Sequence, residues 1–192
     1  MLRMSVKALS PALKIAAATV STVASIGGII GIYLTYYPLT NFNPHVVGRW
    51  NSDYSYPIAG GTLRFKGQTN LFHEGKYNVS GVITLEGKVR NQAYKYTYNV
   101  VGAGSWTADR ERISITLQNL NSFAKSIEVA GMSFTPAEAE KISGTATPNL
   151  SESYPGGMSD EYDLQSITEG TVVLRATGPF GKPFTIQMHR QS

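Results

Sequence analysis

The residues whose type and spacing could best do chemistry are three tyrosines, Tyr94, Tyr96 and Tyr98, at every second position. This spacing puts all three side chains on one face of a β-strand. Aromatic rings with phenolic tips suit an amphipathic small molecule, so the pattern indicates either a ligand surface or core filling. Arg64 and Lys66 are the cations that we add to this candidate ligand site.

Groups for catalysis or metal binding are sparse in the sequence. The three histidines lack the close spacing of a metal site. Asp160, Glu161 and Asp163 could hold Ca²⁺, but the calcium-loop spacing and its terminal Glu are missing, which favours a solvated acidic loop. Nucleophile elbows, phosphate-binding glycine loops and His-Glu-x-x-His helices are also missing. We therefore expect no enzyme, no cofactor and no metal site.

Charge and cysteine content exclude further classes of function. The 192 residues carry a formal net charge of +4, but Arg3, Lys7 and Lys14 precede the first apolar segment and leave only +1 on the rest. This balance does not call for a nucleic-acid polymer as partner. The chain has no cysteine, which removes disulfides, thiolate metal sites and cysteine nucleophiles.

Two-residue alternation of apolar and polar side chains dominates the sequence from about residue 45 onward. It predicts an antiparallel sheet with one buried and one solvated face. Short turns are expected at Ala59-Gly60-Gly61, His73-Glu74-Gly75, Glu86-Gly87 and Gly178-Pro179-Phe180-Gly181. The predicted fold is an all-β, antiparallel up-and-down β-barrel of about eight strands over residues 45–192. The runs that alternate are 63–71, 77–85, 94–100, 113–117, 172–176 and 184–188.

One short helix is expected within the barrel domain. Thr135 supplies an N-cap hydroxyl, Pro136 stands at the first helical position, and Glu138 completes a capping box. Gly144 is expected to end this helix. The following segment, 148–163, is rich in Ser, Pro, Gly and acidic residues and is predicted to be an exposed loop.

An N-terminal transmembrane helix is predicted over residues 14–37, followed by a linker over 38–44. The apolar run is long enough to cross about 30 Å of hydrocarbon, and a cleaved signal peptide is the alternative. Three cations precede the run, and the first cation after it is Arg49. The positive-inside rule then puts residues 1–13 in the cytoplasm. We expect a single-pass signal anchor in the cell inner membrane, with the β-domain on the non-cytoplasmic side.

Small residues recur along the predicted anchor at spacings that align them on one helix face. Such a face lets two helices approach closely and favours a homo-oligomer, although an Ala- and Gly-rich span also shows such a stripe by chance. The residues expected to associate are Ala17, Ser21, Ala24, Gly28 and Gly31.

Gly48-Arg49-Trp50 at the start of the first strand, followed by the eight-strand pattern, resembles the lipocalin-like (calycin) barrels. Gly104-Ser105-Trp106 resembles the repeated turn and Trp pattern of bacterial members. The resemblance implies that Trp50 plugs one barrel end and that a late arginine stacks on it. Arg175 and Arg190 both match, and Arg175 is assigned with Trp50 and Trp106 as the expected plug.

Two functions are predicted from these features. The first is a membrane-anchored, non-enzymatic binding or interaction module for a small amphipathic ligand or an envelope partner. The alternative rests on a layout similar to transmembrane β-barrel effectors of bacterial anti-phage signalling. In that case the barrel senses a cyclic oligonucleotide, and the transmembrane helix oligomerises to disrupt the membrane. A hydrolase with scattered Ser, His and Asp is a third possibility without a motif behind it.

Overall fold

The computed structural model describes residues 43–154 and 156–191. The predicted anchor at 14–37, its five association residues and the segment 1–13 lie outside this range. Within the described ranges, no helix has both the length and the apolar character needed to cross a membrane.

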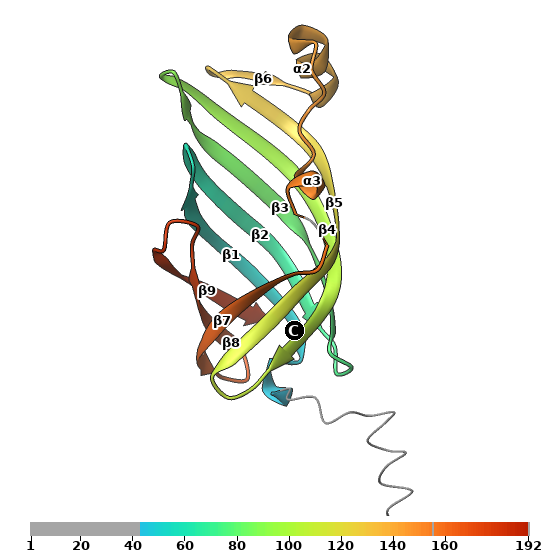
Figure 1. Ribbon diagram of the computed structural model, residues 1–192, viewed down its shortest axis with the longest axis vertical. Coiled ribbons are helices and arrows are strands. Elements are labelled where there is room, and N and C mark those ends of the chain that lie inside the picture. The colour runs from blue at the N-terminus through green and yellow to red at the C-terminus, as the bar shows by residue number, and fades with distance from the viewer. Residues whose placement is uncertain (1–42, 155, 192) are drawn as a thin grey trace, which may run out of the picture. The chain divides into compact units, whose positions relative to one another are not determined.

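The described chain folds into one antiparallel sheet that closes on itself (Figure 1). Consecutive strands pair from β1 to β5, then β5 pairs with β7, and β7, β8 and β9 follow in order. The pairing of β9 with β1 closes a barrel-like ring of eight strands, and β6 forms a short hairpin with β5. The predicted all-β class with about eight antiparallel strands is confirmed.

The elements are η1 (Pro44–Val46), β1 (Gly48–Ile58), β2 (Gly61–Leu71), β3 (Lys76–Val89), β4 (Gln92–Ala108), β5 (Arg112–Val129), β6 (Met132–Phe134), α2 (Pro136–Ser143), α3 (Leu150–Ser153), β7 (Met158–Ile167), β8 (Thr171–Thr177) and β9 (Pro183–Arg190).

The ring is complete at one end only. Strand β1 pairs with β9 only at residues 50–52, and β5 pairs with β7 only at residues 112–117. Beyond these points the strands β1 to β5 continue as a curved sheet without β7, β8 and β9 beside them (Figure 1). We call the end with Trp50 and Trp106 the closed end and the opposite end, toward Ile58 and Val129, the open end.

Alternation along each strand decides which side chains face the inside of the ring. On β4, the even-numbered residues from Tyr98 to Ala108 are all buried, and the odd-numbered residues between them face outward. Residues directly opposite on paired strands share a face, so the register carries this assignment around the ring. Buried side chains at the closed end form one core cluster, and a second cluster lies toward the open end around Leu63, Phe65, Tyr98 and Val100.

Two inward glycines make room for an aromatic ring. Gly67 and Gly81 are paired across β2 and β3, and a Cβ atom at Gly67 would lie 2.7 Å from the Phe65 ring. The missing side chains allow Phe65 to lie over the sheet at this point. Glycine in a strand often marks such a close approach.

Three local predictions are corrected by the structure. Glu86 and Gly87 lie inside β3, which runs on to Val89, and the turn falls at Arg90 and Asn91 with φ values of 50° and 64°. Two consecutive positive φ values are the requirement of a tight hairpin turn. Strand β5 continues to Val129, well past the predicted end at 117. Strand β7 occupies residues 158–167, so the last part of the predicted acidic loop, residues 158–163, is strand.

Helix α2 forms as predicted. The Thr135 side chain accepts a hydrogen bond from the Glu138 backbone N–H, and the Glu138 carboxylate accepts one from the Thr135 N–H at 2.8 Å. Gly144 caps the other end with a φ of 68°. None of the helix residues is buried, because the helix extends from the open end (Figure 1).

Candidate ligand-binding site

Trp50 is fully buried at the closed end and is fixed by its own chain and by β9. Its Nε1 donates a hydrogen bond to the Val46 carbonyl at 2.7 Å, which ties the strand to η1. The Arg190 guanidinium lies 4.2 Å from the centre of the indole ring, in reach of a cation–π interaction. Gly48 has a φ of 141°, and a side chain there would collide with Arg190, so glycine is needed at this position.

Arg190 also joins three segments at the closed end. Its Nη atoms donate to the carbonyls of Val47 and His45 at 3.1 and 3.2 Å, and its Nε donates to the Glu169 carbonyl at 2.6 Å. The assignment of Arg175 to the plug is therefore corrected to Arg190. Arg175 lies exposed between the buried Leu174 and Ala176, and alternation turns its side chain to the outer face.

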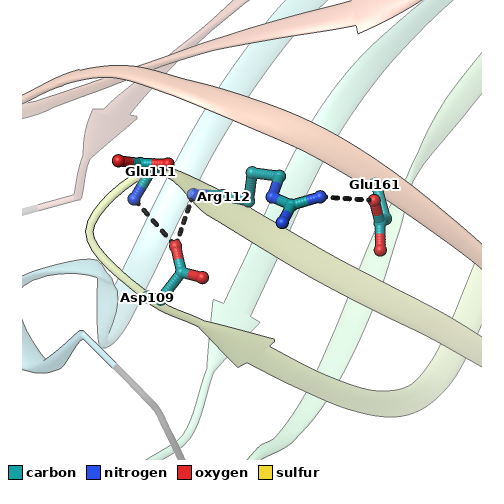
Figure 2. Close-up of polar contacts among 4 residues, drawn as sticks. All are labelled: Asp109, Glu111, Arg112 and Glu161. Atoms are coloured by element: carbon teal, nitrogen blue, oxygen red, sulfur yellow. Dashed lines mark hydrogen bonds and ion pairs between the residues drawn. The ribbon is translucent and has the colours of Figure 1, made fainter.

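Trp106 is the second buried tryptophan of the closed end. Its Nε1 donates a hydrogen bond to the Phe72 carbonyl at 3.1 Å, which links β4 to the turn after β2. The next turn along the chain is stabilised by Asp109, whose carboxylate accepts the backbone N–H groups of Glu111 and Arg112 (Figure 2). These two bonds hold the pKa of Asp109 below its usual range.

The three tyrosines predicted from spacing line the inner face toward the open end. Tyr98 is buried, whereas Tyr94 and Tyr96 are half-buried. The rings of Tyr94 and Tyr96 lie 5.8 Å apart, and the Tyr94 hydroxyl donates to the Gly60 carbonyl at 3.4 Å. Burial raises the pKa of Tyr98.

The two cations added to this site lie on the other side of the sheet. Arg64 and Lys66 alternate with the inward residues Leu63 and Phe65 and are therefore on the outer face. Arg64 forms two hydrogen bonds with the Asp53 carboxylate, at 2.8 and 2.7 Å, which lower the pKa of Asp53. Lys66 lines a hollow of about 610 Å³ on the outer surface. The sheet thus separates these cations from the tyrosines, and the five residues do not form one site.

Four further tyrosines that the sequence analysis did not select point into the ring. Tyr54 and Tyr56 share a face with Trp50 on β1, Tyr77 lies on β3, and Tyr162 pairs with the buried Ile113 on β7. We call these four residues the tyrosine cluster. Tyr54 and Tyr56 also have alternate spacing, so the signal that selected Tyr94, Tyr96 and Tyr98 was available for them. Tyr162 was missed because its segment was predicted to be a loop.

Phenylalanines extend the tyrosine cluster into a larger aromatic surface. The ring of Phe184 on β9 lies 4.7 Å from the Tyr56 ring and 5.9 Å from the Tyr54 ring. Phe65 lies 5.5 Å from Tyr54 on the other side. Aromatic contacts at these distances are typical of packed ring pairs.

One carboxylate faces the inside of the ring beside these tyrosines. Asp160 is paired with Ile115 and Ile115 with Trp106, so all three share the inner face. Glu161 faces outward and lies 3.3 Å from Arg112 (Figure 2). The acids of the predicted Ca²⁺ loop are therefore divided between two faces. Burial raises the pKa of Tyr77 to about 12, and the Asp160 charge adds to this effect.

The inward tyrosines differ in how completely they are covered: Tyr77 is buried, whereas Tyr54, Tyr56 and Tyr162 keep some exposed surface. Burial is the main cause that raises the pKa of Tyr54 and of Tyr162. Both side chains nevertheless keep exposed surface. Protein interiors are close-packed, so a deep side chain keeps exposed surface only where the space beside it is empty. Tyr54 and Tyr162 therefore border surface that solvent reaches.

A short segment around α3 lies against the inner face toward the open end. Leu150 packs against the cluster of Tyr98 and Val100, and Asn149 accepts a hydrogen bond from Ser122. Burial raises the pKa of Tyr56, and the neighbouring Tyr154 adds to this effect. Residues 149–154 thus cover part of the aromatic surface, and we call them the crossing segment.

No protein-family model matches the sequence, and no curated protein matches it either. The candidate site is therefore defined by its geometry alone. Its parts are the tyrosine cluster, the inward Asp160 and the half-buried apolar side chains toward the open end.

Proposed function

We propose that residues 45–192 are a non-enzymatic binding module that holds a small amphipathic ligand on the inner face of the ring. The observation that carries this proposal is the exposed surface that Tyr54, Tyr56 and Tyr162 keep on the inner face of the ring. Phenol rings offer apolar faces and their hydroxyls offer hydrogen bonds, which together suit an amphipathic molecule.

The closed end supports a lipocalin-like (calycin) architecture as part of this proposal. A 3₁₀ turn precedes β1, Trp50 lies at its start, and Arg190 from the last described strand covers the indole. We also propose that residues 14–37 anchor this module to the inner membrane as an uncleaved helix that associates through its small residues. A reporter enzyme fused after Ser192 tests the orientation, because activity in the cytoplasm would contradict it.

The alternative, a sensor of cyclic oligonucleotides, receives less support from the inner face. Among the strand residues that the structure describes, Arg190 is the only Lys or Arg in an inward register, and it is already bound to backbone carbonyls at the closed end. Asp160 faces the same interior and would repel phosphates. The described part of the inner face therefore offers little positive charge that could bind a polyanion.

Small molecules that copurify with the full chain test the proposed function. Ala124 faces inward toward the open end, opposite Tyr98, and its neighbour Phe123 faces outward and is 64% exposed. Ala124→Trp fills the proposed site, and Phe123→Trp adds similar bulk to the outer face. Mass spectrometry of solvent extracts should find a molecule in the wild-type protein and in Phe123→Trp that Ala124→Trp has lost. Identical extracts from all three proteins would contradict the proposal.

A further inference from the structure

We propose that the ligand carries an organic ammonium group and that Asp160 is the carboxylate that binds it. This inference rests on the proposed ligand site and adds the chemical class of the ligand. The ammonium group would lie between Asp160 and the aromatic rings, with an apolar tail toward the open end.

The balance of charge on the inner face is the first argument. Register and alternation make Asp160 the only Asp or Glu in an inward position among the described strand residues. The single inward cation, Arg190, is held at the closed end by three backbone carbonyls and the Trp50 ring. Among the described strand residues, the inner face near Asp160 therefore has one negative charge, on an exposed side chain, and no cation to neutralise it.

The contacts of other carboxylates show how Asp160 differs. Asp53, Glu128 and Glu161 form ion pairs on the outer face with Arg64, Lys95 and Arg112 respectively. In the part of the chain that the structure describes, the Asp160 carboxylate has neither an ion pair nor a hydrogen bond, although its backbone pairs with Ile115. Its carboxylate can thus accept a charged donor from a ligand, and such charge-assisted bonds are stronger than neutral ones.

The surroundings of Asp160 favour an organic cation over a metal ion. Ca²⁺ takes six to eight oxygen ligands, whereas this interior offers one carboxylate among phenols and apolar side chains. Aromatic rings attract ammonium groups through their faces, and the rings of Tyr54, Tyr56 and Phe184 lie together on this inner surface. Burial raises the pKa of Tyr54 and Tyr162, so both phenols stay neutral.

The apolar part of the ligand follows from the side chains beyond the tyrosines. Ile83, Leu85 and Leu120 are half-buried on the inner face toward the open end, next to the cluster of Tyr98 and Val100. An alkyl or aryl tail would cover surface that these side chains leave exposed, and burying it contributes roughly 25 cal/mol per Å². The ligand class is therefore a cationic amphiphile.

Three probes with one tail and different head groups test this inference on the full chain in neutral detergent. These probes are 4-phenylbutylammonium, 4-phenylbutanol and 4-phenylbutyrate, titrated by calorimetry at pH 7 against empty-micelle blanks. We expect the wild-type protein to bind the ammonium about tenfold more tightly than the alcohol, and the carboxylate least. Ala124→Trp should abolish binding of all three.

A matched pair of neighbouring variants then assigns the preference to one residue. Asp160→Asn should lose the tenfold preference for the ammonium and keep its affinity for the alcohol, which also shows that the variant is folded. Glu161→Gln removes an equal charge from the outer face and should bind as the wild type does. Equal wild-type affinity for ammonium and alcohol, with both lost in Ala124→Trp, would overturn the ammonium inference but not the proposed function. If no probe binds in a way that Ala124→Trp abolishes, both fail.

Discussion

The closed and open ends of the ring differ in the number of strands that form the wall and in how completely their side chains are buried and hydrogen-bonded. At the closed end, both tryptophans are buried, and each indole N–H is bonded to a backbone carbonyl. At the open end, tyrosines and aliphatic side chains remain half-buried, and the wall lacks three strands. This difference indicates that the closed end stabilises the fold and that the open end leaves surface for a ligand.

Truncating one aromatic side chain at each end should give the largest difference in the loss of unfolding free energy. Trp50→Ala removes a fully buried side chain and should lower the free energy of unfolding by about 3–5 kcal/mol. Tyr94→Ala at the open end removes a half-buried ring and should cost about 1 kcal/mol. Urea unfolding of the full chain, followed by circular dichroism, measures both. Equal losses would show that the two ends contribute alike to stability.

Arginine substitutions test how Arg190 stabilises the closed end, and their expected effect on the free energy of unfolding is smaller. Arg190→Met removes three hydrogen bonds and the contact with the Trp50 ring and should cost about 2 kcal/mol. Arg175→Met, on the exposed outer face, should change stability by less than about 0.5 kcal/mol. The same unfolding experiment compares the two variants. A larger loss for Arg175→Met would contradict the assignment of Arg190 to the plug.

Alkaline pH should weaken the fold through the tyrosine cluster. The folded-state pKa of Tyr77 is about 12, above its ordinary value of 10.0, so its contribution is complete below pH 10 and is lost as pH rises toward 12. The loss should reach about 1 kcal/mol by pH 11. Tyr77→Phe should flatten the decline of unfolding free energy between pH 9 and 11. An unchanged slope in this variant would show that Tyr77 ionises equally in the folded and unfolded states.

The smallest effect is expected at helix α2, which has no buried residues. Thr135→Ala removes the N-cap and should speed amide hydrogen exchange in residues 136–143 by about fivefold. Global stability should stay within about 0.5 kcal/mol of the wild type, because the helix packs on little of the core. Slower folding or a large global loss in this variant would mean that the helix supports the ring.

Sequence patterns predict features that depend on near neighbours. Alternation predicted the strands, and the capping box predicted α2, because both signals lie within a few residues. The residue that covers Trp50 required the register of β9 relative to β1, which alternation alone does not supply. The prediction that Arg64 and Lys66 join the three tyrosines in one site is wrong. Alternation along β2 puts these two cations on the outer face, whereas the tyrosines lie on the inner face.

Strand β7 shows a second reason why sequence patterns fail to predict a structural feature. Its first four residues, 158–161, include one serine and two acids and are all exposed, because β7 pairs with β5 where the wall begins to open. Such a strand lacks the apolar alternation that reports burial. Asp160 and Tyr162 were therefore assigned to a loop, and their place inside the ring emerged only from the register with Ile113 and Ile115.

The pairing of β1 with β9 also determines when the ring can form. Strand β1 is the first described strand and β9 the last, so closure joins Trp50 to Arg190 across most of the domain. During synthesis the edges of β1 and β8 stay unpaired until β9 has emerged, and contacts so distant in sequence form slowly. Unpaired strand edges readily join other chains, so the barrel is most prone to aggregate just before its last strand is made.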